Sequence, residues 1–159
     1  SLSGRTQEIQ RLIGRALRAG ADLQALGERA LIVDCDVIEA DGGTRTASIV
    51  GGFMALGLAL RKIKQRDEIH AQILTHWISA VSVGLIQGRP LLDLCYAEDS
   101  SAEVDMNVVM ANAKDFVEVQ GTGEHGTYSR TQLNALLDLA ERGCAELMAI
   151  QQQILGALP

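Results

Sequence analysis

Residues 40–48 read ADGGTRTAS, and this stretch decides the predicted fold because it joins a predicted strand to a predicted helix. Its two glycines allow a tight turn, and apolar residues recur at helical spacing directly after them. Thr44 and Arg45 then lie at the helix start, where unbonded backbone N–H groups and the positive end of the helix dipole attract anions. The Arg45 guanidinium can add a bidentate contact. Together with Gly43, these residues predict a small anion site.

The same stretch also allows a plainer interpretation, because a Gly-Gly turn before a helix is common in proteins that bind nothing there. It is not the phosphate-binding loop of nucleotide hydrolases, since the pattern G-x-x-x-x-G-K-[ST] is absent from the chain. Further along the chain, Gly121, Gly123 and Gly126 form a G-x-G-x-x-G pattern, which is not interpreted as a dinucleotide site. Its third glycine falls before the predicted helix cap at Ser129, and no strand follows that helix to close a βαβ unit.

About fifty residues after the glycine turn comes an acidic cluster of Glu98, Asp99, Glu103 and Asp105. Asp99 ends one predicted strand and Asp105 begins the next, so the two strand ends can bring these carboxylates together. Mg²⁺ in proteins commonly takes one or two carboxylates and completes its coordination with water and phosphate. A solvated acidic loop without a metal has the same spacing, so the sequence pattern alone leaves both interpretations open.

Periodicity predicts the remaining elements of an α+β fold. Helices are expected over 6–19 and 46–66, and a long C-terminal helix opens at Ser129, which forms a capping-box pattern with Gln132. Strands are expected over 30–39, 78–87 and 91–97, followed by a hairpin of 106–110 and 116–120. This order predicts a mixed β-sheet packed with helices in two layers, in one domain spanning residues 1–159.

Composition narrows the class of protein. The chain has 159 residues, of which 47% are hydrophobic, so it is long enough for one domain with a real core. No apolar run reaches the roughly 18 residues of a membrane span, so no membrane partner is expected. Three cysteines without C-x-x-C spacing and the lack of a signal-peptide pattern favour a cytoplasmic protein. The net charge of −6 argues against non-specific nucleic-acid binding by the whole surface.

Two charged patterns keep more than one interpretation. Arg11, Arg15 and Arg18 form a stripe along the first helix, which fits a solvated face, a subunit contact or a path for phosphates. Asp34 and Asp36 share one face of the strand predicted at 30–39 and are interpreted as partners for basic residues, with a chemical role as the alternative. The three histidines lack the spacing of a metal site.

Five blocks, in order along the whole chain, resemble the ribonuclease PH family of phosphate-dependent 3′→5′ exoribonucleases. They are GRTQEIQRLIGRALR from residue 4, DCDVIEADGGTRTAS from residue 34, AVSVG from residue 80, LLDLCYAEDSSAEVDMNVVM from residue 91, and FVEVQGTGE from residue 116. The resemblance implies the ribosomal protein S5 domain 2-like architecture of that family. It also implies the trimming of tRNA precursor 3′ ends, with release of nucleoside 5′-diphosphates.

The family's functional residues map onto this chain motif by motif. The resemblance implies that Arg5, Thr44 and Arg45 hold inorganic phosphate, with help from the backbone of Gly43, and that Asp99 and Asp105 bind the catalytic Mg²⁺ or Mn²⁺. No Ser, Cys or His nucleophile is required, because phosphate itself attacks the terminal phosphodiester. The implied partners are RNA, tRNA 3′ ends in particular, and further copies of the chain in a hexamer built from dimers.

Members of the family carry a further section before the GRT motif, so this chain is expected to be N-terminally incomplete relative to them. That section is expected to supply sheet strands and basic residues that approach RNA, and its absence leaves apolar faces that favour association. The alternative function is therefore a non-catalytic RNA-binding or ring-forming subunit, or an inactive fragment of such an enzyme. The presence of all the predicted phosphate and metal residues favours catalysis.

Overall fold

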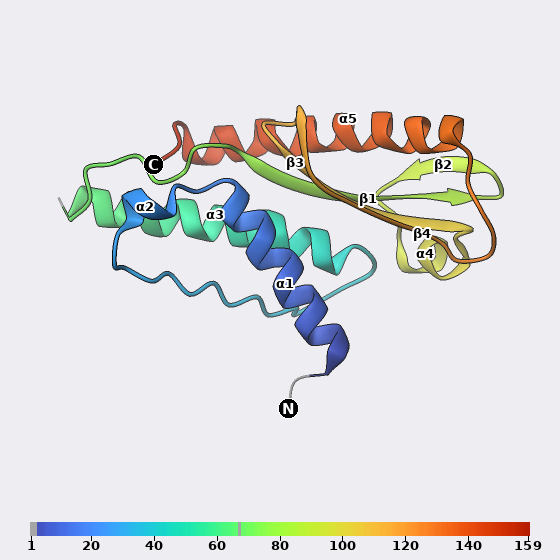
Figure 1. Cartoon of the computed structure of the whole chain (residues 1–159), viewed down its shortest axis with the longest axis horizontal. Coiled ribbons are helices and arrows are strands. Elements are labelled where there is room, and N and C mark those ends of the chain that lie inside the picture. Colours follow the sequence, from blue (N-terminus) through green and yellow to red (C-terminus); the bar gives the residue numbers. More distant parts are fainter. Residues whose placement is uncertain (1–2, 67) are drawn as a thin grey trace.

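The computed structural model describes residues 3–66 and 68–159 of the chain, and Figure 1 shows its helices and strands. Its elements follow in the order α1 (Gly4–Ala19), α2 (Leu23–Leu26), α3 (Thr44–Gln65), β1 (Ile78–Ile86), β2 (Arg89–Leu92), α4 (Tyr96–Ser101), β3 (Val104–Ala111), β4 (Asp115–Gly123) and α5 (Arg130–Leu155). The predicted α+β class is confirmed, as are the three long helices and the β3–β4 hairpin.

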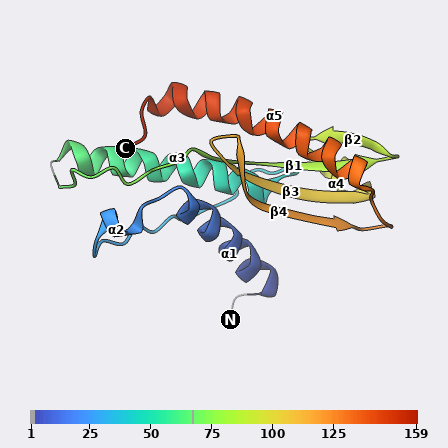
Figure 2. The same ribbon diagram turned by 45° about the horizontal axis from the view of Figure 1, so that its top comes forward.

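One four-stranded sheet with the order β2-β1-β3-β4 forms the centre of the molecule. All three pairings are antiparallel, so the mixed sheet expected from the sequence is corrected to an antiparallel one. Side chains alternate between the faces of each strand. As a result α5 covers one face of the sheet, whereas α1 and α3 lie on the other, as Figures 1 and 2 show. The predicted two-layer arrangement is therefore corrected to three layers, with the sheet between helices.

Each face of the sheet has its own apolar core. Towards α5, Val83 and Val108 pack with Leu136 of the helix, and all three side chains are fully buried. Towards α3, Ile78 of β1 packs with Ile49 and Phe53, which are also fully buried. By length and composition α3 could cross a membrane, but core helices of soluble proteins pass the same test, and α3 packs against the sheet here.

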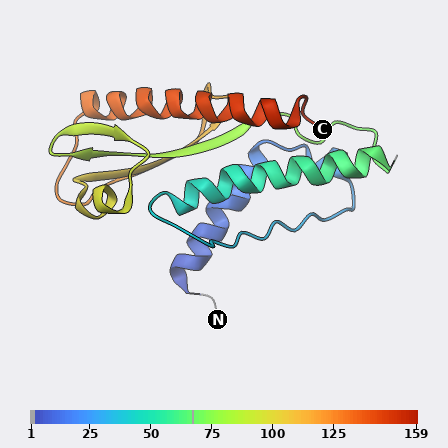
Figure 3. The ribbon, with the colours of Figure 1, turned by 180° about the vertical axis from the view of Figure 1, so that it is seen from behind.

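The strand predicted at 30–39 is wrong. Residues 30–40 run as an extended segment along α3 without pairing, seen as the thin tube below α3 in Figure 3. Within the described residues, no backbone hydrogen bond links this segment to another part of the chain. Val33 packs inward against Gly52 of α3, whereas Ile32 and Ile38 are 94% and 95% exposed. The segment has the extended backbone that the prediction requires, but among the described residues it has no neighbouring strand to pair with.

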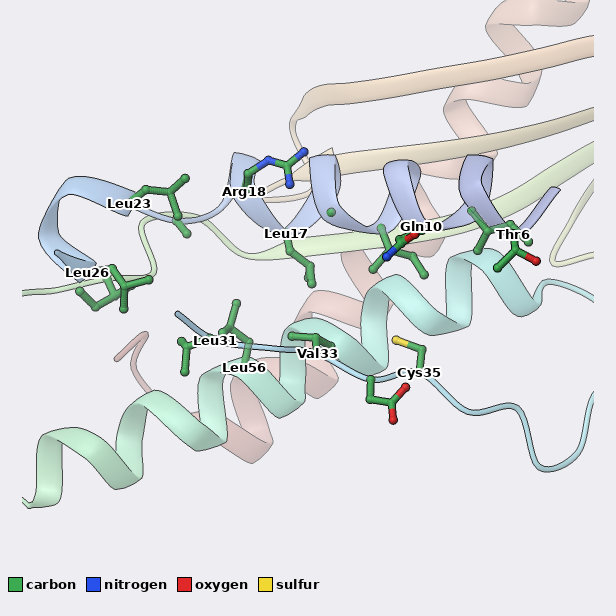
Figure 4. Close-up of a pocket in the computed structure, with 16 residues that line it drawn as sticks. Thr6, Gln10, Leu17, Arg18, Leu23, Leu26, Leu31, Val33, Cys35 and Leu56 are labelled. Atoms are coloured by element: carbon green, nitrogen blue, oxygen red, sulfur yellow. The ribbon is translucent and has the colours of Figure 1, made fainter. Parts of the chain in front are cut away.

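This segment and α1 enclose a groove of about 570 Å³ above α3. Leu17 from α1, Leu31 and Val33 from the segment, and Leu56 from α3 line it, as Figure 4 shows. Asp34 and Asp36 are exposed, and the ion pairs found among the described residues include neither of them. The expectation that these two acids pair with basic residues is therefore not met.

The strand predicted at 91–97 is also corrected. β2 ends at Leu92, and the chain then forms the short helix α4. The helix begins with a capping box, in which the Cys95 backbone N–H donates to Glu98 Oε2 at 3.0 Å and the Cys95 side chain meets the backbone of Glu98. Cysteine is not among the residues that usually mark a helix start, so the sequence pattern concealed this helix.

Candidate active site

The start of α3 is open to an anion. Gly43 is its N-cap residue, with φ 68° and ψ 28°, a left-handed conformation that glycine adopts at little cost. Because glycine has no side chain, it forms no capping hydrogen bond to the first-turn N–H groups. Those groups and the positive end of the helix dipole therefore stay available to a ligand. Thr44 and Arg45 are the first two residues of α3, which begins at Thr44 and not at the predicted residue 46.

The glycine turn is fixed against the start of α4. A Cβ atom on Gly42 would lie 2.2 Å from the carbonyl oxygen of Leu94, so only glycine allows this approach. Asp41 Oδ1 accepts a hydrogen bond of 2.8 Å from the backbone N–H of Tyr96. These two contacts bring the anion site next to the helix that carries Asp99.

Asp99 and Asp105 meet in space, but not as the ends of two strands. Asp99 is exposed on α4, and Asp105 lies half-buried on β3, where it pairs with Gly84 and Thr122. Beyond the effect of burial, the charge of Asp99 raises the pKa of Asp105, so the two carboxyl groups lie near each other. The structure brings these aspartates near each other through a helix and a strand, and their role as metal ligands stays a prediction.

The pKa of Asp105 reports what surrounds it. Burial raises the pKa of this carboxyl most, and the negative charges of Asp99 and Glu124 raise it further. Arg45 acts in the opposite direction and lowers the pKa, so its guanidinium lies within electrostatic reach of Asp105. The anion-site arginine and the aspartate pair therefore belong to one site.

The donor set suits a divalent cation. The carboxylates of Asp99 and Glu124 lie close enough to Asp105 to raise its pKa, in addition to burial, and Arg45 is the opposing cation. Oxygen ligands of this kind match Mg²⁺ or Mn²⁺. Over residues 3–66 and 68–159, no group of three or more His, Cys, Asp or Glu side chains is arranged to hold a metal ion. A cation at Asp99 and Asp105 would need oxygens of water and substrate as its other ligands.

The other two acids of the cluster have structural partners. Glu98 caps α4, as described above, and Glu103 Oε1 accepts a hydrogen bond of 3.1 Å from the backbone N–H of Gly88 in the β1–β2 turn. Glu124, which follows β4, takes their place near Asp105. Sequence spacing indicated a cluster of Glu98, Asp99, Glu103 and Asp105. In the structure, the acids that act on Asp105 are Asp99 and Glu124.

The first helix brings two further charges to the site. Glu8 Oε1 lies 3.4 Å from Arg45 Nη1 and also accepts a hydrogen bond of 3.2 Å from Gln120 Nε2 on β4. Arg5 is exposed in the first turn of α1, three residues before Glu8, and so on the same side of the helix. Both predicted phosphate arginines therefore lie at the same end of α1 and α3.

The arginines of the α1 stripe have different surroundings. Arg15 forms an ion pair of 2.9 Å with Glu118 on β4, which fastens the helix to the sheet. Arg11 lines a polar groove of about 230 Å³ that also contains Glu8, Glu118 and Gln120. The stripe is thus neither a purely solvated face nor a row of equivalent charges.

Two family models match this chain. Residues 1–61 match domain 1 of the 3′ exoribonuclease family, and residues 76–143 match domain 2 of the same family. The chain belongs to the 3′ exoribonuclease family. The resemblance found in the five sequence blocks is confirmed, and the two matches cover both the glycine turn and the aspartate pair.

Curated relatives share more than half of the residues. The chain is 59% identical to a ribonuclease PH of Bacillus pumilus over 98% of its own length, and 56% identical to a ribonuclease PH of Syntrophomonas wolfei over the same share. It spans 64% and 65% of the lengths of these relatives.

Solved structures confirm the fold. A crystal structure of Rrp46 from rice superposes with a TM-score of 0.72 at 16% identity, covering 99% of this chain and 68% of that protein. An archaeal exosome core gives a TM-score of 0.68, also at 16% identity, over 96% of this chain and 66% of that chain. At this identity the likeness concerns the architecture alone.

Sequence reasoning missed Glu8, Gln120 and Glu124. Glu8 stands inside the quoted GRTQE block and Gln120 inside FVEVQGTGE, but they meet across the interface between α1 and β4. Glu124 lies two residues beyond Thr122, the partner of Asp105 in the β3–β4 register. The β3–β4 register places Glu124 near Asp105, and no spacing pattern along the sequence indicates this proximity.

Proposed function

We propose that this chain performs phosphate-dependent 3′→5′ exoribonuclease chemistry, trimming the 3′ ends of tRNA precursors and releasing nucleoside 5′-diphosphates. One observation carries the proposal. Arg45, at the uncapped start of α3, lies within electrostatic reach of a carboxyl pair formed by Asp99 and Asp105. An anion-binding helix end beside a candidate cation site suits a reaction between phosphate and a phosphodiester.

In this reaction an oxygen of inorganic phosphate forms a bond to the phosphorus of the last phosphodiester. The bond from that phosphorus to the 3′ oxygen of the preceding nucleotide breaks. The 3′ oxygen takes up a proton and becomes the new RNA end, while the terminal nucleotide leaves as a diphosphate. The protein therefore needs no covalent nucleophile, and its task is to bring two anions together.

The chain's own residues address that repulsion. Unit like charges about 4 Å apart repel by about 1 kcal/mol in water and by about 4 kcal/mol at an effective dielectric near 20. Arg5 and Arg45 would offset this energy as cations, and the backbone N–H groups from Gly43 onward would fix the orientation of phosphate. A Mg²⁺ or Mn²⁺ ion held by Asp99 and Asp105 would neutralise further negative charge at the reacting phosphate.

The wider setting is proposed from the family. We infer a cytoplasmic protein that acts as a homo-oligomer, with a hexamer of three dimers as the expected form. Its solved structural relatives include exosome subunits. The unpaired segment at 30–40 supports a need for further polypeptide around this chain. It also supports the alternative that the chain is a ring-forming or RNA-binding subunit without its own activity.

A direct assay tests the proposal. The chain is incubated with 3′-extended RNA, Mg²⁺ and phosphate, and the products are separated to detect nucleoside diphosphates. Arg45→Ala is expected to reduce their formation by about 10²-fold or more, the usual effect of removing a preorganised charge contact. Arg18→Ala, on α1 beside Gly14, is the control and should retain activity. Products that form equally without phosphate would indicate hydrolysis, and no products at all would favour the non-catalytic subunit.

A further inference from the structure

The guanidinium of Arg45 already has an anionic partner from within the chain. Glu8 Oε1 lies 3.4 Å from Arg45 Nη1, and the same oxygen accepts the 3.2 Å hydrogen bond from Gln120 Nε2. Three elements meet at this oxygen: the first turns of α1, the start of α3, and β4. A carboxylate and a phosphate present the same kind of acceptor oxygens to a guanidinium.

We propose that Glu8 is an internal counter-ion that competes with inorganic phosphate for Arg45 and thereby sets the phosphate affinity of the site. This inference rests on the proposed function, since it assumes that the anion at Arg45 is phosphate. Glu8 then marks where the anion binds, and it leaves Arg45 when phosphate arrives. It is an affinity-determining residue and takes no part in bond formation.

The geometry of the contact allows release. The Glu8–Arg45 pair is 3.4 Å long and uses one oxygen, and the Glu8 side chain is 51% exposed. The second ion pair between α1 and its surroundings, Arg15 with Glu118, is shorter at 2.9 Å, and its two side chains are 57% and 19% exposed. Exposed, loosely fitted ion pairs contribute little to stability. The Glu8–Arg45 pair has the longer contact of the two, so it can be exchanged at small cost.

Phosphate has two advantages over the Glu8 carboxylate. It carries more negative charge near neutral pH, and it has enough oxygens to reach the uncapped first-turn N–H groups of α3 together with Arg45. The hydrogen bonds found for Glu8 go to Arg45 and Gln120. The carboxylate thus neutralises the arginine without filling the anion site.

A released Glu8 does not remain unpaired. Its bond from Gln120 Nε2 does not involve Arg45 and can persist. Arg11 lies three residues further along α1 and lines the same polar groove as Glu8. Side chains three residues apart on a helix are neighbours, so Arg11 can take up the carboxylate.

Isothermal titration of phosphate into the chain at fixed ionic strength and neutral pH tests the proposal. Glu8→Gln keeps the shape and an acceptor oxygen for Gln120 but removes the charge. It is expected to lower the Kd for phosphate about three- to tenfold, the scale set by one unit charge a few ångströms away at a partly exposed site. A role in shape alone would leave the Kd unchanged or raise it.

Glu118→Gln is the matched control, because it removes the same charge from the same contact between α1 and β4 without touching Arg45. Its Kd for phosphate should stay within twofold of the wild-type value. Unchanged or weaker phosphate binding by Glu8→Gln would overturn the inference, as would an equal gain in the control, which would reflect net charge only.

The same titration separates this inference from the proposed function. If neither the wild-type chain nor Glu8→Gln binds phosphate, the phosphate site and the inference both fail. If both bind as expected but RNA is not degraded in the assay above, the competition by Glu8 stands and only the exoribonuclease proposal is lost.

Discussion

The two faces of the sheet are built very differently. Towards α5 the core is closed, because the side chains of Val83, Val108 and Leu136 are fully buried among one another. On the opposite face α1 and α3 are joined by the extended segment 30–40, which lacks backbone partners and leaves a groove of about 570 Å³. The first face has a closed core, and the second has a buried core of its own beside a groove, so we call them the closed layer and the open layer.

The candidate site lies where these two layers meet. Asp105 belongs to β3, a central strand of the closed layer, whereas Arg5 and Glu8 belong to α1 of the open layer. Arg45 stands between them at the start of α3. One half of the site is therefore held rigidly, and the other half depends on weaker contacts between α1 and β4. Local stability in a protein follows such differences in packing and hydrogen bonding.

Hydrogen exchange gives the largest expected contrast. Amides of residues 30–40 have no backbone acceptor within the described chain and should exchange at almost the unprotected rate. Amides of β1, which pairs with β2 and β3, open only in large unfolding events. We expect exchange in β1 to be slower by about 10³-fold or more, given ordinary domain stabilities. Exchange followed by mass spectrometry at neutral pH measures the ratio.

Equal protection of the amides in residues 30–40 and in β1 would contradict the expected difference between the two faces. It would mean that residues 30–40 had gained a hydrogen-bonding neighbour in solution, and a concentration series would then show whether a second copy of the chain supplies it.

Truncating a large aliphatic side chain should show the next largest difference. Leu136→Ala on α5 empties a fully buried position and should lower the free energy of unfolding by about 2–5 kcal/mol. Ile38→Ala removes a similar side chain that is 95% exposed, and the effect should stay within about 0.5 kcal/mol. Urea denaturation compares them, and a loss at Ile38 as large as that at Leu136 would show that the open layer is covered.

The glycine turn tests how firmly the two layers are joined. Gly42→Ala places a Cβ atom 2.2 Å from the Leu94 carbonyl oxygen, and we expect a loss of about 1–3 kcal/mol as the turn moves away from α4. Gly51→Ala is the control, because an added Cβ there meets no neighbouring atom and sits inside α3. It should gain about 0.5–1 kcal/mol from helix propensity. A harmless Gly42→Ala would mean that the turn is not fixed to the closed layer.

Asp105 should give the smallest effect, and its sign depends on pH. Burial and the neighbouring acids raise the pKa of Asp105 above the ordinary 3.8, so the folded chain binds this proton more tightly than the unfolded chain. Its contribution to stability is complete below the unfolded pKa and is lost as the pH rises through the folded pKa. In EDTA, Asp105→Asn should therefore melt above the wild type at neutral pH, and the difference should vanish near pH 3.

Magnesium completes that experiment. Excess Mg²⁺ should raise the melting temperature of the wild type at neutral pH, because a ligand that binds only the folded chain stabilises it. The Asp105→Asn variant should respond less. A variant less stable than the wild type in EDTA at neutral pH would contradict the electrostatic account.

Much of the fold could be predicted from local patterns. Helices α1 and α3 follow from their apolar spacing, and the start of α5 was placed correctly because Ser129 and Gln132 form the expected reciprocal hydrogen bonds of 3.1 and 2.8 Å. The segment 30–40 could not be predicted in the same way. A strand exists only when it has a neighbour, and alternation along one segment cannot report whether that neighbour is present.

The site could be predicted in part for a related reason. Residues 40–48 carry a local signal for an anion, and the pairing of Asp99 with Asp105 needed only two nearby elements. Glu8 and Gln120, by contrast, are 112 residues apart in sequence and meet through tertiary packing alone. The roles assigned to the arginines and aspartates came from the family resemblance, and they remain predictions until the variants above are assayed.

The acids of the extended segment have a consequence for the behaviour of the chain as a sample. Asp34 and Asp36 stand between the bare isoleucines at 32 and 38, so two copies that align these segments antiparallel would bring like charges face to face. Such charges on an unpaired edge discourage fibril-like stacking. Acidification neutralises these carboxylates, and concentrated salt screens them. We therefore expect the chain to remain soluble near neutral pH and to aggregate at acidic pH or at high salt.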